Sequence, residues 1–229
     1  MTRQIKIFKP KYTVPFASFI WFCHEENFYL NDGVNKIDFV HDYILRNTRT
    51  TPVVLYPGDV WDTNENWKNN SSAIERYTND WNTIMASPSL ATTKKVSIES
   101  LTSAARKFSK QLLDYNSVFV RLLKPTNIYL YDYQQAYRYS LKDGLIPTNQ
   151  HPDYCDIVMT SDALHYCFKF LWGGGTIRVN GRYQLPPYGS FFNFKMYFQI
   201  SGMNNFGERF NLSFIIKQIY KRMVKKIRK

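Results

Sequence analysis

One short segment concentrates the side chains that most often bind metals or move protons. Cys23, His24, Glu25 and Glu26 follow one another directly, after a run that begins Val14-Pro15-Phe16. Imidazole is the commonest ligand of zinc, and a neighbouring carboxylate can orient it or accept a proton. A loop that leaves a strand is also where proteins usually display such groups. The segment therefore predicts a candidate metal ligand at His24, with a partly buried loop histidine as the structural alternative.

The sequence does not supply the further ligands that a metal centre needs. A catalytic zinc ion is usually held by at least three protein ligands, and the remaining histidines are the widely separated His41, His151 and His165. No His-Glu-x-x-His, Cys-x-x-Cys or His-x-His pattern occurs in the 229 residues. We therefore expect no catalytic residue and no metal in the isolated chain.

Composition indicates a folded protein. Hydrophobic residues make up 44% of the chain and aromatic residues 17%, an aromatic content that disordered chains lack. No run approaches the roughly 20 apolar residues of a membrane span, and the first residues lack the apolar stretch of a signal peptide. Three widely spaced cysteines do not indicate a disulfide framework. We therefore expect a cytoplasmic location.

The net charge of +12 is concentrated in the last residues of the chain. Seven basic residues and no acidic residue occur from Lys217 to Lys229. Apolar residues at helical spacing run through the same region: Leu212, Ile215, Ile216, Ile219 and Met223. The pattern predicts an amphipathic helix from about residue 206, packed through this stripe on the preceding unit.

The basic face of this helix is the second candidate site. Four of its residues could contact an anionic surface: Lys221, Arg222, Lys225 and Lys226. A solvated face of a docked helix is the structural alternative. An anionic membrane, nucleic-acid phosphates and a protein partner are the other three interpretations.

Apolar spacing in the first hundred residues alternates between strand and helix patterns. It predicts strands at 12–16 and 52–56, and helices at 37–45 and 74–84. Pro57-Gly58-Asp59 should end the second strand, because proline and glycine favour turns. The alternation is typical of α/β proteins.

The residues after 100 predict a smaller unit with a different mix of elements. A long helical stripe runs from Leu101 to Leu123. Three strands are expected, at 128–131, 155–160 and 176–179. Gly173-Gly174-Gly175 should end a helix, and the stretch 191–200 fits either a helix or a strand. The predicted fold is α/β in residues 1–100, followed in residues 101–229 by a small α+β unit that ends in the basic helix.

Several short motifs in order carry a family resemblance. They are Pro15-Phe16-Ala17-Ser18-Phe19, His24, Leu30-Asn31-Asp32 and Val54-Leu55-Tyr56-Pro57-Gly58-Asp59. Together, over about residues 8–60, they resemble the late part of the metallo-β-lactamase fold in UlaG-like hydrolases and in the CMP-N-acetylneuraminate hydroxylase group. In that family a strand ending in Pro-Phe-Ala or Pro-x-His presents the last histidine of the metal site. On this resemblance the matching residue is His24.

The chain departs from this family at the motifs that carry activity. Members have an upstream His-x-His-x-Asp-His motif that supplies most metal ligands, and the hydroxylase group has a Rieske iron–sulfur domain; both patterns are absent here. The resemblance therefore implies a non-catalytic portion of a hydrolase- or hydroxylase-like assembly. Zinc or iron would bind only with a protein partner that brings the missing motif. The alternative is a binding module for a lipid-like ligand or a protein, or a basic binder of membranes or nucleic acids.

A second resemblance covers residues 153–182. It rests on Asp156-Ile157-Val158-Met159-Thr160-Ser161-Asp162-Ala163-Leu164 and on Trp172-Gly173-Gly174-Gly175-Thr176-Ile177-Arg178-Val179-Asn180-Gly181-Arg182. These stretches are similar to a sterol-carrier-protein-2-like domain, which some metallo-β-lactamase-fold proteins carry at the C-terminus. No catalytic residue is implied by this resemblance.

Overall fold

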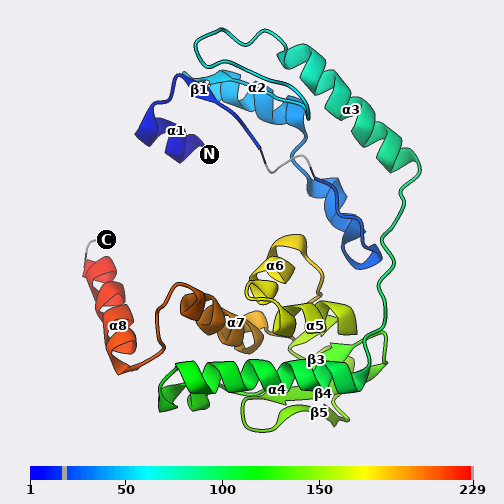
Figure 1. Ribbon diagram of the computed structural model, residues 1–229, viewed down its shortest axis with the longest axis vertical. Helices are drawn as coiled ribbons and strands as arrows, with labels where there is room; N and C mark the ends of the chain where they lie inside the picture. The colour runs from blue at the N-terminus through cyan, green and yellow to red at the C-terminus, as the bar shows by residue number, and fades with distance from the viewer. Residues whose placement is uncertain (17–19, 228–229) are drawn as a thin grey trace. The chain divides into compact units, whose positions relative to one another are not determined.

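Helices and sheets are both present in the computed structural model, which describes residues 1–16 and 20–227 (Figure 1). The chain divides into two units, Met1–Ala91 (unit 1) and Thr92–Lys229 (unit 2). The mixed α and β character expected from the sequence is confirmed at this general level. The boundary expected between residues 100 and 101 falls inside a helix, Ile98–Tyr115, and the division observed lies before that helix.

Unit 1 contains mainly helices and two very short strands. In chain order its elements are α1 (Thr2–Phe8), β1 (Tyr12–Thr13), η1 (Glu25–Gly33), α2 (Ile37–Asn47), β2 (Thr51–Pro52) and α3 (Asn70–Ala86). The helices expected at 37–45 and 74–84 are confirmed as α2 and α3. Of the strand expected at 12–16, only Tyr12–Thr13 is formed, and of the strand expected at 52–56, only Pro52 belongs to β2. A small core of Ile37, Val54 and Ala73 joins α2, the chain after β2, and α3.

The strands of unit 1 form a two-stranded parallel sheet. Thr51 N–H donates to the Lys11 carbonyl and Val53 N–H to the Thr13 carbonyl, both at 2.9 Å. The other edge of β2 is occupied by a side chain, because Asn70 Nδ2 donates to the Pro52 carbonyl and Asn70 Oδ1 accepts from Val54 N–H. Within the described residues, no strand pairs with the outer edge of β1.

Unit 2 is built around a four-stranded sheet. Its elements are α4 (Ile98–Tyr115), η2 (Val118–Leu122), β3 (Thr126–Leu130), β4 (Gln135–Ser140), β5 (Gly144–Thr148), η3 (Pro152–Tyr154), β6 (Ile157–Met159), α5 (Ser161–Lys169), α6 (Gly173–Asn180), α7 (Phe191–Asn205) and α8 (Leu212–Ile227). The strand order is β5-β4-β3-β6. β3, β4 and β5 are antiparallel neighbours, and β6 is parallel to β3.

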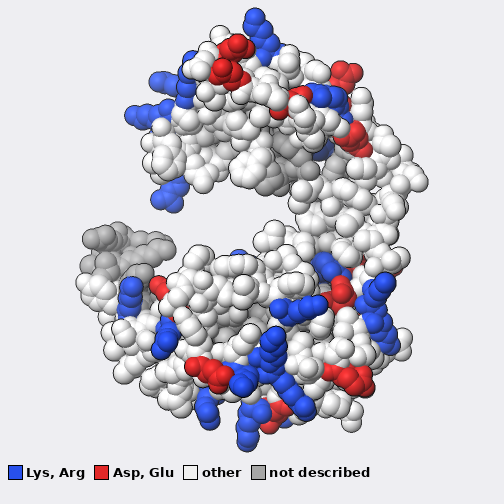
Figure 2. All heavy atoms as spheres, viewed as in Figure 1, with Lys and Arg blue, Asp and Glu red and all other residues white. Residues whose placement is uncertain are grey.

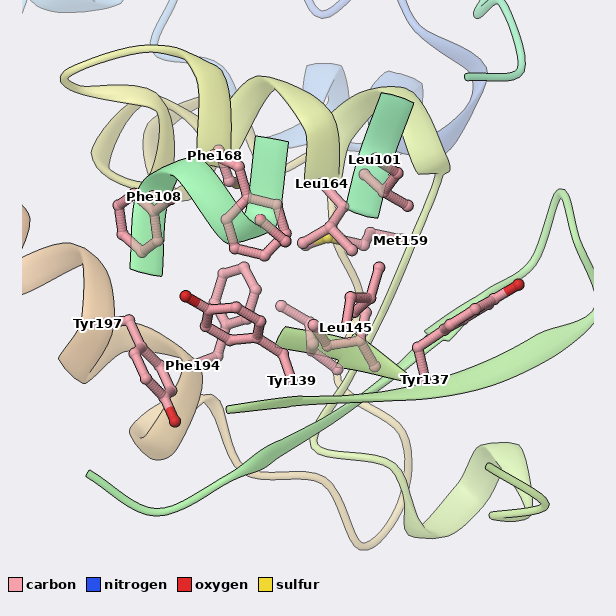
Figure 3. Close-up of a cluster of buried hydrophobic side chains, with 14 of the residues drawn as sticks. Leu101, Phe108, Tyr137, Tyr139, Leu145, Met159, Leu164, Phe168, Phe194 and Tyr197 are labelled. Carbon is pink, nitrogen blue, oxygen red and sulfur yellow. The ribbon is translucent and has the colours of Figure 1, made fainter. Parts of the chain in front are cut away.

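The main core lies between this sheet and the helices of unit 2. Figure 3 shows Phe108 of α4, with side chains of α5 and α7, packed around Tyr139 of β4, and Leu101 of α4 near Met159 of β6. The Tyr139 ring lies 4.8 Å from that of Phe168 and 4.9 Å from that of Tyr197. Its hydroxyl is 2.9 Å from Ser109 Oγ, so the buried phenol has a polar partner.

Two sequence expectations for unit 2 are wrong. Residues 176–179 belong to α6 and not to a strand, and Gly173-Gly174-Gly175 begins this helix. A Cβ on Gly174 would overlap the Phe198 ring, so glycine is needed here for close helix packing and not for a turn. The ambiguous stretch 191–200 is helical, in α7. The hairpin β4–β5 was not expected from the apolar pattern.

The C-terminal helix forms as α8, but its expected docking is contradicted at three of the five stripe residues, because Leu212, Ile216 and Met223 are each more than half exposed. Ile215 is half-buried, and the side chain of Ile219 lies outside the described residues. The chain is anchored just before the helix, where Phe210 packs against the core and its N–H donates to Asn116 Oδ1 at 2.7 Å. This anchor attaches the segment that precedes α8 to unit 2.

Candidate functional sites

His24 lies at the start of η1, after the loop that leaves β1. It is the N-cap of this 3-10 helix and forms a capping box with Asn27, whose Oδ1 accepts from the His24 backbone N–H at 3.0 Å. The His24 backbone also forms a bridge to Ala91. Asn31 holds the same loop, because its Nδ2 donates to the Phe22 carbonyl at 2.9 Å. His24 is therefore a half-buried residue in a locally fixed loop.

The thiol and carboxylate groups near His24 do not converge with it on a metal site. Within residues 1–16 and 20–227, no three His, Cys, Asp or Glu side chains form a group that could hold a metal ion. The other three histidines lie in separate places in the fold. His41 Nδ1 lies 3.3 Å from Asp42 Oδ1, and His151 caps η3. Burial lowers the pKa of His165. Since a centre needs at least three ligands, the described residues alone do not fit zinc or iron.

A charged and aromatic group on unit 1, the Arg76 cluster, was not identified from the sequence. Arg76 Nη2 donates to both carboxylate oxygens of Asp59, at 2.7 and 2.8 Å, and the guanidinium carbon lies 4.4 Å from the Tyr56 ring centroid. The Tyr56 hydroxyl donates to Asp80 Oδ2 at 2.6 Å. These residues, with Tyr77, make up the Arg76 cluster, which joins the turn after β2 to α3.

Two groups in the Arg76 cluster, Asp59 and Tyr56, have shifted pKa values. The hydrogen bond from Arg76 lowers the pKa of Asp59, so this carboxylate stays ionised to lower pH. The hydrogen bond to the Asp80 carboxylate raises the pKa of Tyr56, so the phenol stays protonated. The cluster is a fixed set of charges that ties two segments together. Its sequence signal is Arg76 and Asp80 at a spacing of four residues, on one face of a helix.

A cavity of about 340 Å³ lies beside the Arg76 cluster in unit 1. Its walls are mainly aromatic and aliphatic and include Trp21, Val34, Ile37, Tyr77 and Trp81. Its charged lining residues are Asp38, Asp80 and Lys36, and the Lys36 ammonium lies 5.6 Å from the Trp81 ring. An apolar body with a few polar groups at its edge is the usual form of a small-molecule site.

The basic candidate site on the C-terminal helix can be placed only by its backbone. Lys221, Arg222, Lys225 and Lys226 belong to α8, and their side chains lie outside the described residues. Within the part of the chain that is described, none of the helices has the length and apolar character needed to cross a lipid bilayer.

Comparison with known proteins gives no relative from which a role could be assigned. No family model, no curated protein and no solved structure matches the chain significantly.

Proposed function

We propose that this chain is the non-catalytic part of a metallo-β-lactamase-fold, hydrolase-like assembly. A protein partner carrying the His-x-His-x-Asp-His motif would complete it and would supply most ligands for zinc or iron. Unit 1 would be the incomplete fold half, and unit 2 a sterol-carrier-protein-2-like α+β unit. The free thiols Cys23, Cys155 and Cys167 favour a reducing compartment such as the cytoplasm.

The observation that carries this proposal is the open edge of β1. Parallel sheets are usually larger than two strands and are covered on both faces, because isolated strand pairs are only marginally stable. β1 and β2 pair over two residues each. Val14 and Phe16, directly after β1, expose large apolar side chains, and Phe16 is 80% exposed. A strand from a partner, added beside β1, would pair this edge and cover these side chains.

His24 would then contribute one ligand to a centre that the partner completes. It is half-buried within the same unit as the open edge, and its loop is fixed by Asn27 and Asn31. An imidazole held in a fixed loop is pre-organised for a metal ion. No reaction step is assigned to this chain, since a single candidate ligand is identified in it.

Affinity purification of the tagged chain from its native host tests the proposal. We expect a co-purifying polypeptide whose sequence contains His-x-His-x-Asp-His, together with zinc or iron in the complex. The double variant Val14→Lys/Phe16→Lys should lose this polypeptide, because charges oppose strand addition at an edge. Val60→Lys is the matched control, since Val60 is 90% exposed in unit 1 and lies outside the edge.

The variant His24→Asn separates the role of His24 from the role of the edge. Asparagine is a good N-cap, so the local fold should persist while the imidazole is removed. We expect the complex to form with less than half of its metal, measured by elemental analysis. A complex with unchanged metal would remove His24 from the centre. Purification of the same polypeptides by the wild-type chain and the edge variant would contradict the proposal itself.

A second candidate function, a stand-alone binding module, is favoured by the 340 Å³ cavity of unit 1. Its lining has two carboxylates and one ammonium group beside several aromatic rings, so a small organic cation would fit it better than an anion. Hexylamine and hexanoate are suitable probes. If this function holds, hexylamine should quench the fluorescence of Trp21 and Trp81, hexanoate should not, and Asp80→Asn should weaken the effect.

A further inference from the structure

Unit 2 has a cluster of exposed apolar side chains where α5 meets α6. Phe170, Leu171 and Trp172 are consecutive, each about half exposed or more, and Leu171 is 69% exposed. Phe206, at the end of α7, is 78% exposed, and its ring lies 5.2 Å from that of Trp172. These four residues form the Trp172 patch. Contiguous exposed apolar side chains usually mark an interaction surface, whereas single ones are common on any protein.

The position of the Trp172 patch is fixed by the helices beneath it. Asn205 Nδ2 donates to the Leu171 carbonyl at 2.8 Å, which links the α5–α6 turn to the end of α7. A Cβ on Gly202 of α7 would lie 3.6 Å from Trp172 Cζ3, an ordinary van der Waals contact, so the Trp172 ring lies directly beside α7. The aromatic side chains are therefore presented by packed helices and not by a loose loop.

Three basic side chains lie beside the Trp172 patch. The Lys169 ammonium lies 5.5 Å from the Phe170 ring. An adjoining groove of about 190 Å³, lined by Leu171, Trp172 and residues of α6 and α7, includes Arg178 and Lys195 and no acidic residue. Glu208 is an acidic residue close to Phe206 in the sequence. Figure 2 shows that Lys and Arg side chains also gather elsewhere on unit 2. The effect of Lys169, Arg178 and Lys195 must therefore be separated from that of the other positive charges of the unit.

α8 repeats the same combination of apolar and basic residues. Leu212, Ile216, Tyr220 and Met223 are each more than half exposed, and their spacing of three or four residues puts them on one helix face. The sequence adds seven basic residues and no acidic one from Lys217 onward. A helix of this composition favours the interface of an anionic bilayer, with its axis in the membrane plane.

We propose that unit 2 binds the surface of an anionic membrane through the Trp172 patch and α8. Tryptophan and phenylalanine would enter the boundary between headgroups and acyl chains, and Lys169, Arg178 and Lys195 would contact lipid phosphates. A fluid bilayer can take up the apolar side chains of both the Trp172 patch and α8, because it needs no surface complementary in shape to either of them. Nucleic acid would use the positive charges but would leave Leu171, Ile216 and Met223 uncovered.

Vesicle co-sedimentation of the full chain tests this membrane proposal. We expect binding to vesicles of phosphatidylcholine mixed with phosphatidylserine, little binding to phosphatidylcholine alone, and weakening by added salt. The variant Leu171→Ser/Phe206→Ser should reduce the partition coefficient at least tenfold. Leu122→Ser is its matched control, because Leu122 is 76% exposed in the same unit and is also flanked by a basic residue. It should leave binding unchanged.

The charge contribution is tested by a second matched pair of variants. Each Lys or Arg near an anionic surface contributes about fivefold in affinity, so Arg178→Gln/Lys195→Gln should weaken binding roughly 25-fold. Lys107→Gln/Lys110→Gln removes two exposed charges from α4 and should have a much smaller effect. Circular dichroism of each variant checks that the fold is kept.

Three results would overturn the membrane proposal. One is equal binding to vesicles with and without phosphatidylserine. Another is an equal loss of binding in the patch variant and in Leu122→Ser. The third is binding of soluble short-chain phosphatidylserine as tightly as of vesicles, which would indicate a pocket for a single lipid molecule and not a membrane surface.

Discussion

The hydrogen bond between Ser109 and Tyr139 can be removed without disturbing the packing around it. Tyr139→Phe deletes the hydroxyl and keeps the ring that packs on Phe168 and Tyr197. Both partners are buried, with exposed fractions of 5% for Ser109 and 1% for Tyr139. The variant therefore leaves the Ser109 hydroxyl without its partner in a region that water does not reach.

The expected loss of stability follows from the cost of an unsatisfied buried hydroxyl. Tyr139→Phe should reduce the free energy of unfolding by about 1–3 kcal/mol, and Ser109→Ala should have a similar effect. The double variant removes both polar groups, so its loss should be smaller than the sum of the two single losses. The coupling energy of this double-mutant cycle should be about 1–2 kcal/mol.

Urea denaturation followed by circular dichroism measures these differences, provided that the m values of the four proteins agree. Ser109 lies in α4 and could donate instead to a backbone carbonyl one turn earlier. In that case Tyr139→Phe would cost less than about 0.5 kcal/mol and the coupling would vanish. Such a result would refute the argument that this hydrogen bond stabilises the core.

Tyr139 also gives the core a dependence on alkaline pH. Burial raises its pKa above the ordinary value of 10.0, so the folded state keeps the proton while the unfolded state loses it. Its contribution to stability is complete below pH 10 and decreases as the pH rises above this value. A titration of unfolding midpoints from pH 8 upward should therefore fall less steeply for Tyr139→Phe than for the wild-type chain. Equal slopes would contradict this assignment.

Three further predictions concern other elements. Gly174→Ala should destabilise unit 2 by about 1–3 kcal/mol because its methyl group would overlap Phe198, whereas Gly175→Ala, with open space around it, should be neutral or stabilising in thermal denaturation. Arg76 lowers the pKa of Asp59, so the wild-type carboxylate stabilises the protein above pH 3.8 and loses this effect as the pH falls. Asp59→Asn should therefore make the free energy of unfolding, measured by denaturation at a series of acidic pH values, less dependent on pH. Truncation after Asn211 should leave the melting temperature of unit 2 nearly unchanged, and a large decrease would show that α8 packs on the core.

Helices with one apolar face were predictable from the sequence. α3 follows the apolar spacing closely. α4 follows it from Ile98 to Tyr115, but the stripe expected to continue to Leu123 is interrupted there, and Val118–Leu122 form the separate 3-10 helix η2. The β4–β5 hairpin was not predictable in the same way. β4 buries residues on both faces, so it lacks an alternating pattern, and the turn before it contains Gln134 in the left-handed conformation, with φ of 51°.

Residues 173–181 show why local signals can mislead. Three glycines before β-branched residues, followed by Asn180-Gly181, are typical of a strand and a hairpin turn. Gly174 contacts Phe198 of α7, which is 24 residues further along the chain, so the local sequence pattern does not reveal this contact. Gly181, with φ of 64°, ends a helix here, which is the other common use of glycine at such a position.

The candidate sites differ in how far the sequence could define them. His24 is prominent as a residue type, but its capping box with Asn27 depends on the conformation of the loop. The Arg76 cluster forms because the loop between β2 and α3 brings the turn after β2 against this helix. The length of that loop does not reveal which residues of the turn and of α3 face each other. The Trp172 patch and the α8 stripe are exposed because other apolar residues fill the core of unit 2. The sequence alone does not show which apolar residues are buried and which stay on the surface.

The two edges of the small sheet in unit 1 differ, and this difference limits how copies of the chain can associate. Asn70 occupies the hydrogen-bonding groups of Pro52 and Val54 on one side, so a new strand can be added only on the β1 side. A sheet that grows at both edges can form open-ended fibres, whereas one with a single available edge stops after one addition. Strand pairing at unit 1 should therefore give discrete complexes, with one added strand per chain.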